Sequence, residues 1–155
     1  MRLLRQWAPL LLVLGLIWVL STLLFSADST SRVVFPALRK IIPAITIREL
    51  VEIHYWMRKL AHVCVYFVLS LVLLRSLRAG RPGWELSTTL GVLGLILAIA
   101  FLDELHQFYV PGRGPSIRDV VLDSAAGALA QVFAWQRARR KPRLPERSGT
   151  AEPAN

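Results

Sequence analysis

Apolar residues gather in four runs separated by polar segments, and this pattern predicts a bundle of membrane-spanning helices. The runs cover residues 8–25, 60–74, 86–102 and 117–135. The first run has 18 uncharged residues, and a helix of that length extends about 27 Å, close to the ~30 Å hydrocarbon core of a bilayer. We therefore expect an all-α, multi-pass membrane protein with four transmembrane helices.

Composition supports a membrane protein over a soluble one. Of the 155 residues, 54% are hydrophobic and 19% are charged, which excludes a disordered chain. The net charge is +9, but the basic residues lie between the apolar runs. The expected partner is therefore the lipid bilayer, and nucleic acid is not expected. A single cysteine, Cys64, excludes an intrachain disulfide and a cysteine-rich zinc site.

The first run has two interpretations, an uncleaved membrane anchor or a cleaved signal peptide. Arg2 and Arg5 give the basic start that both share. Cleavage after Ser26 or Ala27 would place a bulky leucine or phenylalanine where small residues are needed. The sequence therefore favours an anchor over residues 1–25.

Charge placement predicts the orientation of the bundle. With both termini in the cytoplasm, the inner segments 1–7, 75–85 and 136–155 hold 11 Lys or Arg, and the rest of the chain holds 8. This is a modest positive-inside bias. Seven of the ten acidic residues fall on the outer side, so any chemistry is expected there.

The segment 26–59 is expected outside the cytoplasm. Thr46 and Glu49 match a capping box, and the apolar stripe that follows predicts an interfacial helix or, equally, one long tilted helix over residues 47–77. Pro36 and Pro43 are expected to break the chain before it. Residues 60–135 form the predicted core of three transmembrane helices, and the basic tail 136–155 is expected to be disordered.

Polar residues in the second run share one helix face. Lys59, His62 and Tyr66 are spaced at i, i+3 and i+7. An ionisable group at mid-membrane costs roughly 2.5–3.5 kcal/mol, so such a stripe indicates a functional site. Taken singly, each residue also has a structural explanation: a snorkelling lysine, a locally bonded histidine and an interfacial tyrosine.

Two acids follow the third run, in the segment that holds Asp103, Glu104, His106 and Gln107. Carboxylates at the carboxyl end of a helix oppose its macrodipole, at about 0.3–1 kcal/mol each. We expect Lys59, Arg113 or a ligand to hold them, although a solvated polar cap also fits.

The turn at residues 110–115 and the fourth run add more polar groups. Glycine and proline make the turn rigid, and it presents Arg113, which suits a carboxylate or phosphate. Ser116 and Asp119 fit a helix cap and its first-turn acid. Asp123 lies too deep to cap, so we expect it to meet His62 or Tyr66. Small residues that allow close helix packing follow it: Ser124, Ala125, Ala126, Gly127, Ala128 and Ala130.

These motifs resemble the VanZ-like family of integral membrane proteins. The resemblance covers roughly residues 55–135 and depends mostly on the string Asp103-Glu104-Leu-His-Gln107-Phe-Tyr-Val-Pro-Gly-Arg113, with Arg58, Lys59, His62, Tyr66, Ser116 and Asp119. It implies a small multi-pass protein of the bacterial inner membrane. The founding member is linked to low-level resistance to teicoplanin, a glycopeptide antibiotic. The family usually has asparagine where this chain has Asp123.

Three functions remain open. The first is an outer-face pocket that binds an envelope or lipid-linked ligand and modulates glycopeptide susceptibility. The expected ligand-binding residues are Lys59, His62, Tyr66, Asp103, Glu104, His106, Gln107, Arg113, Ser116, Asp119 and Asp123.

The second function is a membrane enzyme in which the same cluster performs acid–base or metal-assisted chemistry. We favour a non-enzyme and expect no cofactor or metal, because the chain lacks a His-Glu-x-x-His motif and a serine elbow. The third is a structural ion-pair network, with Lys59 bound to Asp103 or Glu104 and Arg113 bound to Asp119 or Asp123.

Overall fold

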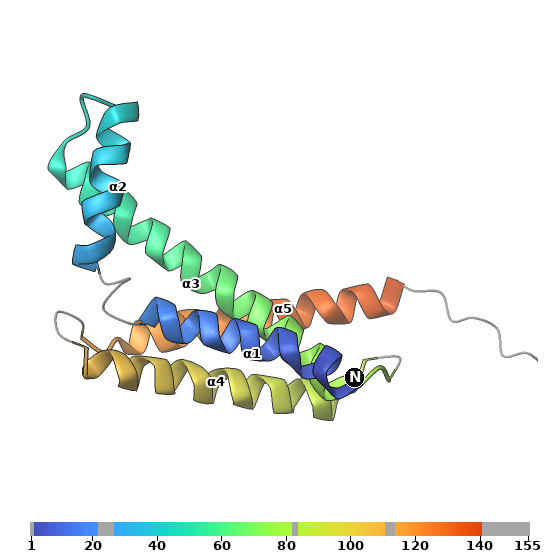
Figure 1. Cartoon of the computed structure of the whole chain (residues 1–155). Helices are drawn as coiled ribbons and strands as arrows, with labels where there is room; N and C mark the ends of the chain where they lie inside the picture. Colours follow the sequence, from blue (N-terminus) through green and yellow to red (C-terminus); the bar gives the residue numbers. More distant parts are fainter. Residues whose placement is uncertain (1, 22–26, 82–83, 111–113, 141–155) are drawn as a thin grey trace, which may run out of the picture.

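The computed structural model describes residues 2–21, 27–81, 84–110 and 114–140, and this part of the chain is helical without a strand. The described residues form five helices, which Figure 1 labels. They are α1 (Arg2–Ser21), α2 (Ala27–Ile41), α3 (Ile47–Arg78), α4 (Leu86–Phe108) and α5 (Ile117–Arg140). The all-α prediction is confirmed.

Four of the helices form a bundle. α3 packs against α5, α1 and α4, and α4 also packs against α5 and α1. Within the described residues, α2 packs against α3 alone. Figure 1 shows α2 and the first half of α3 projecting together from one end of the bundle. That end is also where α1 and α4 finish and where α5 begins.

α3 is one continuous helix of 32 residues, about 48 Å long at 1.5 Å per residue. Its start has the predicted capping box: the Thr46 hydroxyl accepts from the Glu49 N–H at 3.3 Å, and the Glu49 carboxylate accepts from the Thr46 N–H at 2.8 Å. It ends in a left-handed turn at Ala79 and Gly80. The long-helix alternative is therefore confirmed, and the backbone has no break between residues 59 and 60.

The prediction that Pro36 breaks the chain was wrong, because Pro36 lies inside α2. Proline removes one helical hydrogen bond, and packing against α3 compensates. Thr30 is hydrogen-bonded to His54 of α3 at 2.8 Å, and the Phe35 ring meets the same imidazole edge-on, with centroids 5.8 Å apart. Pro43 lies in the turn between α2 and α3, as predicted.

The core of the bundle lies between α1, α3, α4 and α5, and its completely buried residues are on the last three. Leu69 of α3, Val92 and Ile96 of α4, and Ala130 of α5 are completely buried. Large apolar side chains are exposed around the outside of the same helices, such as Leu97 of α4. This distribution fits a protein surrounded by lipid rather than water.

Three described helices are long and apolar enough to cross a membrane: Leu3–Ser21, Ile47–Arg78 and Leu86–Phe108. α5, which covers the fourth predicted span, is not among them, because polar residues interrupt its apolar sequence. α5 continues through Arg140, five residues into the segment predicted to be a disordered tail. The rest of that tail, 141–155, lies outside the described residues.

Candidate functional site

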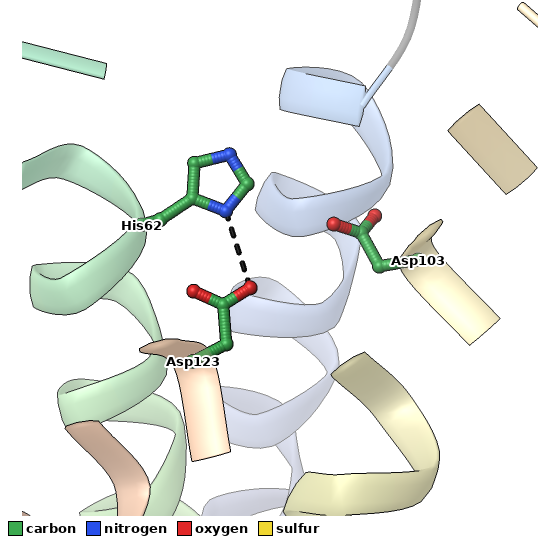
Figure 2. Close-up of side chains that lie close together, drawn as sticks. All are labelled: His62, Asp103 and Asp123. Carbon is green, nitrogen blue, oxygen red and sulfur yellow. Dashed lines mark hydrogen bonds and ion pairs between the residues drawn. The ribbon is translucent and has the colours of Figure 1, made fainter. Parts of the chain in front are cut away.

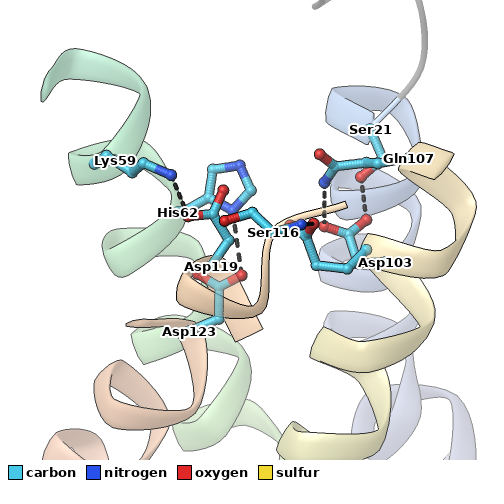
Figure 3. Close-up of polar contacts among 9 residues, drawn as sticks. Ser21, Lys59, His62, Asp103, Gln107, Ser116, Asp119 and Asp123 are labelled. Carbon is cyan, nitrogen blue, oxygen red and sulfur yellow. Dashed lines mark hydrogen bonds and ion pairs between the residues drawn. The ribbon is translucent and has the colours of Figure 1, made fainter. Parts of the chain in front are cut away.

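Polar side chains from four helices meet at the end of the bundle from which α2 and α3 project (Figure 3). We call this group the polar end. It consists of Ser21 of α1, Lys59 and His62 of α3, Asp103, Glu104 and Gln107 of α4, and Ser116, Asp119 and Asp123 at or in α5. All of them except Ser21 were predicted from the sequence. Figure 3 labels all of them except Glu104 and shows the labelled side chains facing one another across the space between the helices.

His62 and Asp123 form the deepest contact of the polar end. Nδ1 of His62 lies 3.2 Å from Oδ2 of Asp123, and Asp123 is completely buried. The sequence prediction that Asp123 meets His62 or Tyr66 is confirmed for His62. The Tyr66 ring lies nearly parallel to the imidazole, with centroids 6.5 Å apart. The tyrosine hydroxyl has no hydrogen-bond partner among the described residues.

Neutral donors hold the Asp103 carboxylate. The Ser21 hydroxyl donates to one of its oxygens, and Nε2 of Gln107 donates to the other at 3.0 Å. The contact with Gln107 follows from their i, i+4 spacing in α4. Sequence reasoning missed Ser21, because its partner lies 82 residues along the chain and the only signal is a serine at the end of an apolar run.

Glu104 is buried and accepts a hydrogen bond from the backbone N–H of Ser116, at 2.6 Å. Ser116 directly precedes α5, so the carboxylate lies at the amino end of that helix, where its macrodipole favours negative charge. The described structure therefore holds both acids by neutral donors. The prediction that Lys59 holds them was wrong.

Lys59 forms an ion pair with Asp119, not with Asp103 or Glu104. α3 and α5 start at the same end of the bundle and run in the same direction. Lys59 precedes His62 by three residues, and Asp119 precedes Asp123 by four, so the two helices make two matched contacts one turn apart. Both partners of the ion pair are mostly buried, with side-chain exposures of 20% and 16%.

Three predicted site residues are not part of the polar end: Tyr66, which only stacks on His62, and His106 and Arg113. His106 stacks on Trp18 of α1, with ring centroids 4.5 Å apart, and sequence reasoning gave no sign of that contact. Arg113 lies outside the described residues, so its predicted ion pairs and ligand contact stay predictions.

A cavity of about 200 Å³ adjoins the polar end. Its walls come from α1, α2, α3 and α4. The apolar part of the lining includes Ile17, Leu20, Val34, Met57 and Val65. The polar part consists of Ser21, Thr30, His54, Arg58, His62, Tyr66 and Asp103. The cavity thus combines an apolar wall with acid, base and cationic groups. His54 and Thr30 were not predicted, because nothing in the sequence places α2 beside α3.

The geometry allows two kinds of chemistry. His62 and Asp123 are within hydrogen-bond distance, as a general acid–base pair requires. His62, Asp103 and Asp123 also present one donor atom each within 4.8 Å of one another, which is the type of group that holds a metal ion (Figure 2).

The fold and the polar end describe a helical membrane protein with ionisable groups between its helices. The family model VanZ/LLP1 matches residues 7–138, so the chain belongs to the VanZ/LLP1 family. The resemblance read from the sequence is confirmed, and the match extends further toward the amino terminus than the motifs do. Neither the curated proteins nor the solved structures give a match to the chain.

Proposed function

We propose that this protein is a bacterial inner-membrane protein that binds a lipid-linked ligand of the cell envelope at its polar end. In this proposal α1, α3, α4 and α5 all span the membrane, both termini are cytoplasmic, and the polar end faces outward. Family membership and the apolar helices support the membrane location.

The position of α5 supports its role as the fourth span. α5 packs along both α3 and α4, which meet the requirements of a span themselves. Arg137, Arg139 and Arg140 lie at its far end, as Arg75 and Arg78 do in α3. The positive-inside rule favours the cytoplasm for both clusters.

The observation that carries the proposal is the mixed lining of the cavity. Apolar side chains of α1, α2 and α3 form one part of its wall, and Arg58, His62 and Asp103 form another. A ligand with an apolar chain and a polar headgroup fits both parts. A cationic guanidinium in the lining favours an anionic headgroup such as a phosphate.

Photo-crosslinking tests this proposal. A polyisoprenyl phosphate with a diazirine in its chain is incorporated into nanodiscs with the purified protein, and labelling is measured by mass spectrometry. Ala61 lines the cavity, so Ala61→Trp is expected to fill it and lower labelling at least about tenfold. Val68 is exposed on the same helix and is outside this lining, so Val68→Trp is the matched control and is expected to label like the wild type.

Equal labelling of the wild type and Ala61→Trp would contradict the proposal. A diazirine-bearing phosphatidylglycerol serves as a second probe. Preferential labelling by the polyisoprenyl phosphate supports an envelope-precursor ligand, whereas equal labelling by both probes contradicts it. We also propose that the occupied site lowers susceptibility to teicoplanin. A strain that expresses Ala61→Trp should then be as susceptible as one that lacks the protein, and a strain that expresses Val68→Trp should match the wild type.

A further inference from the structure

Three helices each contribute one metal-type donor to a single point in the polar end. The donors are His62 of α3, Asp103 of α4 and Asp123 of α5, and their ligand atoms all lie within 4.8 Å of one another. Figure 2 shows the imidazole and both carboxylates turned toward the same space. From this geometry we infer that His62, Asp103 and Asp123 bind a divalent transition-metal ion.

The spacing of the donors suits a metal after a small adjustment. Ligand atoms about 2.0–2.2 Å from one ion lie roughly 3–3.6 Å from each other. The 3.2 Å between Nδ1 of His62 and Oδ2 of Asp123 is already in that range. The other ligand atoms lie up to 4.8 Å apart, so they must approach by about 1 Å when the ion binds.

Two buried polar atoms point to a ligand at this position. Asp123 is completely buried, and its second oxygen has no partner among the described residues. Tyr66 is 1% exposed, its hydroxyl is also unpartnered there, and it lines the cavity together with His62 and Asp103. A carboxylate in such a place is costly unless a cation compensates it. A bound ion supplies the cation, and a water molecule on it supplies a partner for the tyrosine.

The surroundings of Asp103 resemble the outer shell of a metal site. Ser21 and Gln107 donate hydrogen bonds to its two oxygens, which fixes the orientation of the carboxylate. The cavity reaches His62 and Asp103, so an ion has a route to the site.

The donor set indicates the kind of metal. Imidazole nitrogen suits first-row transition metals, whereas Mg²⁺ and Ca²⁺ prefer oxygen ligands alone. One imidazole and two carboxylates, with open positions for water, suit Zn²⁺ or Mn²⁺. The purpose of the ion rests on the proposed function: beside Arg58 it would hold the phosphate of the lipid-linked ligand.

Metal titration without any added lipid tests the site itself. The tag-free protein in detergent is stripped with EDTA and titrated with Zn²⁺ and, separately, with Mn²⁺ by calorimetry. One equivalent of at least one metal is expected to bind. Asp123→Asn keeps the shape of the side chain and is expected to weaken metal binding at least about tenfold. Even substitutions of residues that only hydrogen-bond to a metal ligand lower metal affinity about 10–100-fold. Glu85→Gln removes an exposed carboxylate at the far end and should leave the affinity unchanged.

X-ray absorption of the Zn²⁺-loaded protein should show nitrogen and oxygen donors near 2.0–2.1 Å and no sulfur. His62→Gln and Asp103→Asn give the same test if Asp123→Asn does not fold. The inference is overturned if the wild type binds neither metal, or if these variants bind as tightly as the wild type. Because no lipid is present, failure here leaves the crosslinking result to decide the proposed function separately.

Discussion

A Cβ atom placed on Gly127 would lie 2.7 Å from Cγ2 of Ile96. α4 and α5 therefore approach so closely here that a side chain at position 127 requires Ile96 to shift. Gly127→Ala is expected to destabilise the protein by about 1–2 kcal/mol, because overpacking costs about 1–3 kcal/mol and alanine recovers up to about 1 kcal/mol as a better helix former. The thermal midpoint of the detergent-purified protein measures the loss.

Two further variants make that prediction specific. Gly94 of α4 has nothing within 4 Å of an added Cβ, so Gly94→Ala should be neutral or stabilising. Ile96→Ala makes room for the new methyl group, so the double variant with Gly127→Ala should be more stable than the sum of the two single effects predicts. Strict additivity would mean that the two side chains do not meet.

Ser70 and Gln131 form a buried polar link between α3 and α5. The Ser70 hydroxyl donates to the Gly127 carbonyl at 2.9 Å and accepts from Nε2 of Gln131 at 2.8 Å. Ser70→Ala should lower stability by about 0.6 kcal/mol and by no more than about 1.7 kcal/mol, which are the average and the maximum for side-chain hydrogen bonds between membrane helices. Ser124→Ala in α5 is the matched control, because the buried Ser124 hydroxyl has no partner among the described residues. An equal loss in both variants would count against this link.

Contacts set by helical spacing and by depth were predictable from the sequence. Thr46 and Glu49 are three residues apart, and Asp103 and Gln107 are four apart, so local geometry alone brings each pair together. The second and fourth apolar runs both begin on the outer side, so the sequence could place Asp123, six residues into its run, near His62 or Tyr66, which lie two and six residues into theirs. Helical spacing and depth predict which residues face the interior of the bundle and how far along the helices they lie.

Contacts that depend on how helices are arranged around the bundle were not predictable. The partner of Lys59 is set by the register of α3 against α5, and the hydrogen bond from Ser70 of α3 to the Gly127 carbonyl of α5 belongs to the same register. Ser21 and Trp18 reach Asp103 and His106 only because α1 lies beside α4. No local pattern in residues 2–21 indicates which helices α1 packs against. The position of α2 beside α3 was missed for the same reason.

Charge-reversal variants of Lys59 and Asp119 test whether this ion pair has a structural role or a role in ligand binding. Lys59→Asp places two like charges together, and so does Asp119→Lys, so each single reversal should lower stability by about 1 kcal/mol or more. The double reversal restores an ion pair and should recover most of the thermal midpoint. If it also recovers photo-crosslinking by the polyisoprenyl phosphate, the pair only holds α3 against α5. Recovery of stability without recovery of crosslinking shows that Lys59 takes part in binding.

Cysteine labelling tests the orientation and the span of α5 together. Cys64 is exposed, so the experiment starts from Cys64→Ser. Gly114→Cys lies just before α5, whereas Glu85→Cys and Arg137→Cys lie at the opposite end of the bundle. With both termini in the cytoplasm, a membrane-impermeant maleimide should label position 114 in intact spheroplasts. Positions 85 and 137 should react only after permeabilisation.

The three positions give distinct answers for α4 and α5. Opposite labelling of 85 and 114 shows that α4 crosses the membrane, and opposite labelling of 114 and 137 shows the same for α5. If 114 and 137 react alike, α5 does not span, and the proposal of four spans is wrong. If 85 and 137 react in intact spheroplasts while 114 is protected, the polar end faces the cytoplasm. A ligand from the outer face could then not reach the cavity, because His62 and Asp103 would lie on the wrong side of the bilayer.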